Sequence, residues 1–221
     1  MTAEKTKEKT CNLPEDRNPY TVNDPAGAYE LSPDRLYTYA DYLTWADIKM
    51  REIMNGALKL FASPSRKHAQ VTAEILVELR NCIKKNKGKC HVYTAPFDVR
   101  LPDKSGETTD DKIYTVLQLD ICVVCDLSRL DDKGCLGAPD LVVEMQSPSI
   151  GRYDLTQKFL AYESAGVREY WTVMPGDGIT VYRLSEDGKY DAGTVFVYDA
   201  VVTFCVLEGL AVKLKELFED L

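Results

Sequence analysis

The sequence predicts an α/β protein with a central mixed β-sheet flanked by helices and preceded by a short helix and a β-hairpin. Two observations support this class. Several segments alternate apolar and polar residues with the period of a β-strand, and others carry apolar residues at helical spacing. No repeat, low-complexity block or interdomain linker divides the chain. We therefore expect one domain over residues 36–221, behind a polar arm over residues 1–35.

The first half of the chain predicts a helix, a hairpin and a longer helix. Thr38 is placed to cap a short helix, and Asn55-Gly56 is typical of a type I′ turn between two short strands. Ser63-Pro64-Ser65 leads into a long amphipathic helix that ends in a basic segment. The apolar residues at helical spacing are Val71, Ile75, Leu76, Leu79, Cys82 and Ile83.

The second half predicts strands interrupted by one long helix. The run YTVLQLDICVVCD indicates a single strand with Asp120 and Cys122 on the same face. DLVVEMQS indicates another strand with Glu144 and Gln146 on one face, and DLTQKFLAYESAG a helix closed by Gly166. A glycine-rich loop is expected between the two strands. Further strands are predicted from CHVYTAPFDVRL, REYWTVM, GITVYRLS, KYDAGTVFVYD and VVTFCVL, and a final helix from VKLKELFEDL.

Composition excludes several classes of protein. With 221 residues, 45 % of them hydrophobic and 28 % charged, the chain is not a disordered, fibrous or small disulfide-stapled protein. It has no apolar run of about 18 residues that could cross a membrane. The N-terminus lacks the apolar segment of a signal peptide, so we expect a cytoplasmic protein.

The seven cysteines are scattered, and in a reducing compartment we expect free thiols. Cys122 and Cys125 form a C-x-x-C, but in a strand these two positions point to opposite faces, so they do not predict a zinc site. His68 and His91 are the only histidines, too few for a histidine-rich metal site. Phosphate-binding glycine loops are absent, so we expect no nucleotide cofactor.

The charge is unevenly distributed along the chain. The net charge is -8, with 16 basic and 13 acidic residues in positions 1–100, and 11 basic and 22 acidic residues after them. Such a balance argues against a protein held to nucleic acid by bulk charge. An acidic region can still act on a polyanion when divalent metal ions neutralise its carboxylates.

Asp120 and Glu144 are the first candidate site residues. Each is an acid within an apolar strand segment, where a carboxylate is costly unless it is paired or binds a metal. If the two strands are neighbours, both acids could reach one Mg²⁺, with Gln146 on the same face as Glu144. The alternative is a solvated strand edge, or acids paired with lysine or arginine.

Lys158 and Tyr162 share one face of the helix that follows Glu144, and two interpretations of Lys158 remain open. It could form an exposed ion pair with Asp154, four residues earlier, or lean towards Glu144 and stabilise charge on a phosphate. Glu52, in the hairpin, is either an exposed strand residue or a third acid in the same cavity. His68, in the first turn of the long helix, is typical of a capping or packing residue.

These residues belong to a familiar pattern. The run GAPDLVVEMQSPSIGRYDLTQKFLAYESAGVREYWTV closely resembles the signature of the Uma-two endonuclease family, in the PD-(D/E)XK nuclease superfamily. The hairpin with Glu52, the segment SPSRKH and the strand with Asp120 also fit, so the resemblance spans roughly residues 36–220. It implies a restriction-endonuclease-like fold.

The resemblance also implies residue roles. Asp120 and Glu144 would be metal-binding acids for Mg²⁺ or Mn²⁺, with Glu52 as a third. Lys158 would be the superfamily's lysine moved onto the helix, and Gln146 stands where that lysine usually lies. The resemblance thus implies five catalytic residues: Asp120, Glu144, Lys158, Glu52 and Gln146. The nucleic-acid contacts that we expect are His68, Tyr162, Lys84 and Lys85.

The function implied is metal-dependent hydrolysis of phosphodiester bonds in DNA, and a homodimer would allow both strands to be cut. Two alternatives remain open. A catalytically silent member of the fold would bind nucleic acid or act as a scaffold. A hydrolase of small phosphoesters would use the same acids without a polymer substrate.

Overall fold

The chain divides by its internal contacts into two units, Met1–Arg35 and Leu36–Leu221. The computed structural model describes residues 35–45, 50–60, 63–146, 152–207, 209, 211–219 and 221, with the backbone alone for residues 152–154. The predicted polar arm lies outside the described residues except for Arg35. The second unit is described below.

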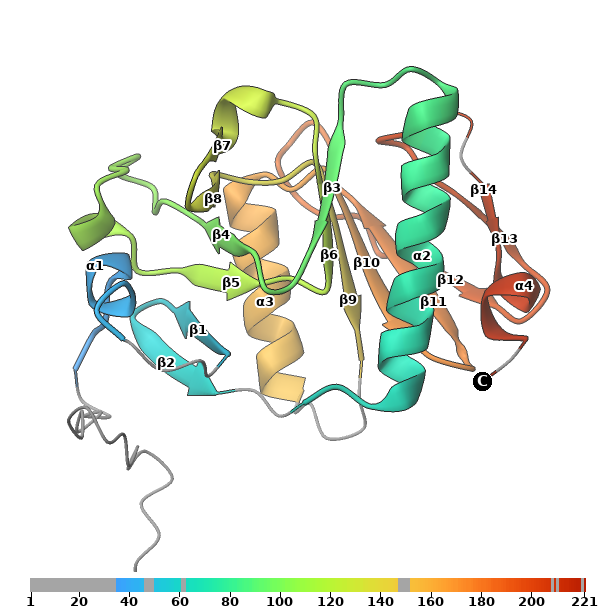
Figure 1. Cartoon of the computed structure of the whole chain (residues 1–221), viewed down its shortest axis with the longest axis horizontal. Helices are drawn as coiled ribbons and strands as arrows, with labels where there is room; N and C mark the ends of the chain where they lie inside the picture. The colour runs from blue at the N-terminus through green and yellow to red at the C-terminus, as the bar shows by residue number, and fades with distance from the viewer. Residues whose placement is uncertain are drawn as a thin grey trace, which may run out of the picture. The chain divides into compact units, whose positions relative to one another are not determined.

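Two six-stranded mixed sheets form the framework of this unit (Figure 1). In the first sheet the order is β12 (Thr194–Val197), β11 (Gly178–Arg183), β10 (Glu169–Met174), β9 (Leu141–Met145), β6 (Ile121–Val124) and β3 (His91–Thr94). Only β9 and β10 pair in parallel there. In the second sheet the order is β2 (Ala57–Leu60), β1 (Arg51–Met54), β5 (Val116–Gln118), β4 (Asp98–Arg100), β8 (Gly134–Leu136) and β7 (Leu130–Asp131). This confirms the predicted mixed α/β architecture.

Two long helices pack on opposite faces of the first sheet. Helix α2 (Arg66–Lys85) buries its apolar residues in one hydrophobic cluster, whose sheet residues include Ile121 and Val143. Helix α3 (Arg152–Ala165) contributes Tyr162 to a second cluster, which also contains Val142 and residues of the second sheet. Helix α3 therefore lies where both sheets contribute side chains, and it can connect acids carried by each.

The smaller elements complete the fold. They are α1 (Tyr39–Tyr42), the 3₁₀ turns η1 (Asp110–Lys112) and η2 (Leu127–Arg129), the pair β13 (Val201–Thr203) and β14 (Ala211–Lys213), and α4 (Leu214–Phe218). Among the described residues, no helix is long and apolar enough to span a membrane.

The local sequence signals explain where the predicted elements begin and turn. Thr38 and Asp41 form a capping box at the start of α1, and Ser65 accepts the backbone N–H of His68 at the start of α2. Asn55 and Gly56 both have positive φ, as the turn between β1 and β2 requires. These expectations from the sequence are confirmed.

The predicted strand over YTVLQLDICVVCD is wrong, because it is two strands in different sheets. β5 ends at Gln118 in the second sheet and β6 begins at Ile121 in the first. Leu119 packs in the same cluster as Cys122, whereas Ile121 lies in the cluster under α2. The chain therefore changes sheets at Asp120, which places this acid at the junction. The expected glycine-rich loop also contains two short strands, β7 and β8.

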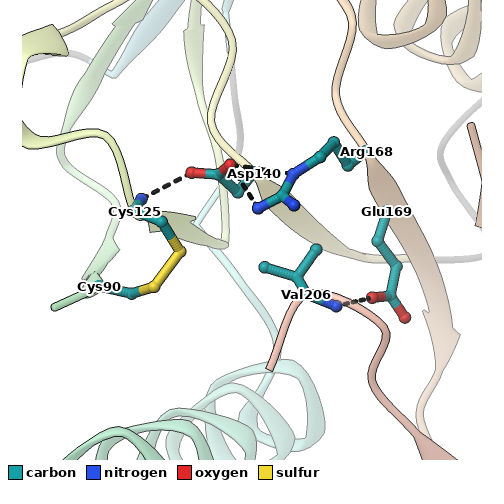
Figure 2. The surroundings of a disulfide bond; sticks show 6 residues. All are labelled: Cys90, Cys125, Asp140, Arg168, Glu169 and Val206. Atoms are coloured by element: carbon teal, nitrogen blue, oxygen red, sulfur yellow. Dashed lines mark hydrogen bonds and ion pairs between the residues drawn. A yellow bond between two sulfur atoms is a disulfide. The ribbon is translucent and has the colours of Figure 1, made fainter. Parts of the chain in front are cut away.

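Two of the cysteines expected to be free form a disulfide, Cys90–Cys125 (Figure 2). Cys90 immediately precedes β3 and Cys125 immediately follows β6; because these strands pair antiparallel with His91 opposite Val124, the two cysteines face each other. The backbone N–H of Cys125 donates to Asp140 at 2.6 Å. Cys122 is instead buried and free, so the two cysteines of the C-x-x-C are not joined to each other.

Gly134 offers a sharp test of the second sheet. Its φ is +130°, and a Cβ there would collide with the backbone carbonyl oxygen of Asp98 on β4. Gly134→Ala should therefore lower the free energy of unfolding by more than about 2 kcal/mol in urea denaturation.

Gly106→Ala is the matched control. Gly106 also has positive φ, but a Cβ added there would have no neighbouring atom within 4 Å. We expect a cost of about 1 kcal/mol, from backbone strain alone. Equal costs for the two substitutions would contradict the close packing of β8 on β4.

Candidate active site

Asp120 is held by two different elements at the sheet junction. Its Oδ2 accepts the backbone N–H of Met145 at 2.7 Å, which ties it to the end of β9. Its Oδ1 lies 2.8 Å from Nε2 of His68, in the first turn of α2. The side chain retains 18 % exposure, so it is reachable from solvent.

Glu144 lies next to this point, on the face of β9 that points towards α3. Its Oε1 accepts a hydrogen bond from Tyr162 Oη at 2.6 Å and another from Lys158 Nζ at 3.0 Å. Lys158 and Tyr162 are four residues apart, so both reach the same carboxylate from one helical face. The alternation of β9 predicted this orientation of Glu144 correctly.

Lys158 also binds a second carboxylate, from the other sheet. Its Nζ lies 3.0 Å from Oε1 of Glu52 on β1, and the backbone N–H of Gln118 donates to the same oxygen at 2.9 Å. The exposed fractions of the Lys158 and Glu52 side chains are 8 % and 0 %. A buried ammonium thus bridges two acids that are far apart in the sequence.

This geometry decides between the interpretations left open by the sequence. Lys158 does not lie on the exposed helix surface; it is buried against Glu144. The side chain of Asp154 lies outside the described residues. Glu52 is the third acid of the cluster rather than an exposed strand residue. His68 does more than occupy a capping turn, since its ring contacts Asp120.

The electrostatics of the cluster follow from two acids, Glu144 and Glu52, that share one lysine, with the charge of Asp120 close to Glu144. Burial raises the pKa of Glu144, and the negative charges of Asp120 and Glu52 raise it further, against the opposing effect of Lys158. Burial alone would lower the pKa of Lys158, but Glu144 and Glu52 outweigh it and hold that pKa above its ordinary value. Lys158 is therefore a permanent cation at neutral pH.

A supporting network that sequence reasoning missed fixes Gln118, the backbone donor to Glu52. The Gln118 side chain accepts the backbone N–H of Phe97 at 2.7 Å and donates to Tyr42 Oη and to Asp98. Asp98 in turn accepts Tyr39 Oη at 2.7 Å. The polar residue in an apolar strand was a signal for Gln118, but its partners come from elements that only the fold brings together.

The remaining predicted residues are placed as follows. Tyr162 is fully buried, so its expected role as a nucleic-acid contact is corrected to a hydrogen-bond donor within the cluster. Gln146 follows β9, and its backbone N–H donates to the carbonyl of Val173. Lys84 and Lys85 are exposed in the last turn of α2, away from the helix end that carries His68.

Asp120 and Glu144 are the described residues that could hold a hard divalent cation. Within the described part of the chain, no group of three or more His, Cys, Asp or Glu side chains is arranged to hold a metal. Mg²⁺ commonly takes only one or two protein carboxylates and completes its shell with water and phosphate oxygens. Asp120 and Glu144 supply such a pair, since the charge of Asp120 destabilises ionised Glu144 and a cation would relieve this repulsion.

Comparison with known proteins agrees with this fold. The family model of Uma2, described as "Putative restriction endonuclease", matches residues 39–214. A solved structure, the "putative nuclease belonging to DUF820" from Anabaena variabilis ATCC 29413, is similar with a TM-score of 0.66 and 19 % sequence identity. The match covers 83 % of this chain and 98 % of that chain. No curated protein matches.

The described unit therefore has the mixed α+β fold of a nuclease-like protein. The chain belongs to the Uma2 family, as its sequence resemblance predicted.

His68 provides a test of the Asp120 environment in metal-free protein. The hydrogen bond to Asp120 is the main cause that raises the pKa of His68 above 6.5, against the effect of burial. The pair of His68 and Asp120 should stabilise the fold fully at a pH below the pKa of His68 in the unfolded protein. This stabilisation should be lost as the pH rises through the pKa of His68 in the folded protein. An NMR titration of the histidine ring signals should show the raised pKa of His68. The signal that is missing from the spectrum of His68→Gln identifies the His68 ring.

Asp120→Asn should lower the pKa of His68, because the negative partner is removed. An unchanged His68 titration in this variant would show that the two side chains do not interact in solution.

Proposed function

We propose that the protein is a metal-dependent endonuclease that hydrolyses phosphodiester bonds in DNA. The observation that carries the proposal is the convergence of Asp120, Glu144 and Lys158 from the sheet junction, β9 and α3. A buried permanent cation beside two acids suits a reaction in which negative charge develops on phosphorus. Membership of a family described as "Putative restriction endonuclease" supports the polymer substrate.

In this proposal Asp120 and Glu144 hold Mg²⁺ or Mn²⁺. The metal would lower the pKa of a bound water and polarise the phosphodiester. Glu144 is oriented by Tyr162, and Asp120 by His68 and the Met145 backbone N–H. Each carboxylate is thus fixed before substrate arrives.

Lys158 acts in this scheme as a charge, not as a base, because its pKa lies above its ordinary value. It orients the attacking water or neutralises charge on the phosphate. Glu52 positions Lys158: it is fully enclosed, and its Oε1 already accepts both the Lys158 ammonium and the Gln118 N–H. We therefore assign metal ligation to the two acids nearer solvent.

The test is cleavage of supercoiled plasmid DNA with Mg²⁺ or Mn²⁺ in the presence and absence of EDTA. We expect nicked and linear products only with metal. Glu144→Gln and Asp120→Asn should each reduce the rate at least about 100-fold, because either change weakens charge stabilisation in the transition state. Glu78→Gln, on the exposed side of α2, is the matched control and should retain activity.

The unfolding midpoint of each variant must be compared with that of wild type, so that loss of activity is separated from loss of folding. Failure of folded wild type to cleave DNA with either metal would overturn the proposal in favour of a silent, binding member of the fold. Hydrolysis of a chromogenic phosphodiester with none of DNA would overturn it in favour of a small-molecule hydrolase.

A further inference from the structure

A basic pocket lies beside the first sheet, at the end of α2 opposite to His68. This pocket of about 340 Å³ opens between the last turns of α2 and the start of β3, the edge strand of the sheet. Its lining includes Arg80, Lys84 and Lys87 from the helix side, and His91 and Tyr93 from β3. The volume suits one sugar-phosphate unit of a larger ligand.

The pocket is strongly basic on an acidic chain. Arg80, Lys84 and Lys87 are exposed cations, His91 adds a protonatable ring, and no lining residue is acidic. Among the residues that the structure describes, none of the three cations forms an ion pair with a carboxylate. The whole chain has a net charge of -8, so these cations make the pocket a local region of positive charge that would attract an anion.

The edge of β3 runs from this pocket towards the candidate active site. At the far end of β3, the Ala95 N–H donates to the carbonyl of Leu119, the residue before Asp120. His91 and Ala95 are four residues apart, about 13 Å along a strand. Along α2, Lys84 follows His68 by 16 residues, about 24 Å. The pocket is therefore separate from the acidic cluster but within reach of the same polymer.

We propose that this pocket is a second nucleic-acid contact, which binds a backbone phosphate of the DNA whose scissile bond lies at Asp120 and Glu144. The inference rests on the proposed function and adds to it a fixed spacing. With the duplex axis along β3 and α2, and at an axial rise of 3.4 Å per nucleotide, the phosphate in the pocket lies about four to seven nucleotides from the scissile bond. Contacts of this kind position a nucleic acid without reading its sequence.

The basic segment contains its own control. Lys84 and Lys87 line the pocket, whereas Lys85 and Lys89, interleaved with them, are exposed but do not line it. Lys85, which the sequence predicted as a nucleic-acid contact together with Lys84, is therefore not part of this proposed site. The variants Lys84→Gln/Lys87→Gln and Lys85→Gln/Lys89→Gln lose the same charge from the same segment. A difference between them reports the pocket and not the overall charge of the segment.

Binding is measured by fluorescence anisotropy with a labelled DNA duplex of about 20 base pairs in EDTA, so that no cleavage is needed. Lys84→Gln/Lys87→Gln should raise Kd about tenfold and reduce the slope of log K against log salt by about 1.8, as expected for two lost phosphate contacts. Lys85→Gln/Lys89→Gln should raise Kd less than about twofold. Equal effects of the two double variants, with both folded, would overturn the proposal.

A further arm identifies the ligand. If the pocket variant lost binding of a fluorescent mononucleotide but kept the DNA Kd of wild type, the pocket would serve a free nucleotide and the inference would be wrong. Pocket-dependent DNA binding without cleavage would instead contradict only the proposed nuclease activity.

Discussion

The buried ammonium of Lys158 is the interaction on which the rest of the structure depends. It contacts Glu144 from the first sheet and Glu52 from the second, each at 3.0 Å, and so joins both sheets through α3. Removing one member of such a set leaves an uncompensated buried charge, at a cost of about 3–5 kcal/mol. A lysine in this place is thus required by the two acids around it, and it constrains how the sheets pack.

The same constraint prepares the site for chemistry. Because Lys158 and Tyr162 both bind Oε1 of Glu144, that carboxylate has a defined position beside Asp120. Asp120 is fixed independently, by β9 and by α2. Lys158 is shared by Glu52 and Glu144, and Asp120 is paired with His68. In the proposed function, a divalent cation at Asp120 and Glu144 would relieve the repulsion between these two acids. Structural stability and proposed catalysis therefore depend on the same few groups.

Local sequence patterns correctly predicted the strand faces, helix caps and turns, which depend on residues close together in the chain. The alternation of DLVVEMQS placed Glu144 on the correct face, and cap and turn residues located α1, α2 and the hairpin. The change of sheet at Asp120 was missed because both halves of that run alternate, so the pattern shows no break. The Cys90–Cys125 pair and the contacts of Gln118 depend on which strands become neighbours, which no local pattern contains. The pairing of Glu52 with Lys158 likewise depends on which strands and helices become neighbours.

A double-mutant cycle between Glu52 and Lys158 is the most direct test of this account. The free energy of unfolding is measured for wild type, Glu52→Gln, Lys158→Met and the double variant by denaturant titration in metal-free buffer. The account predicts that each single change is costly and that the double variant costs less than their sum, with a coupling of about 2 kcal/mol. Costs that add to within about 0.5 kcal/mol would contradict a buried lysine shared by the two sheets.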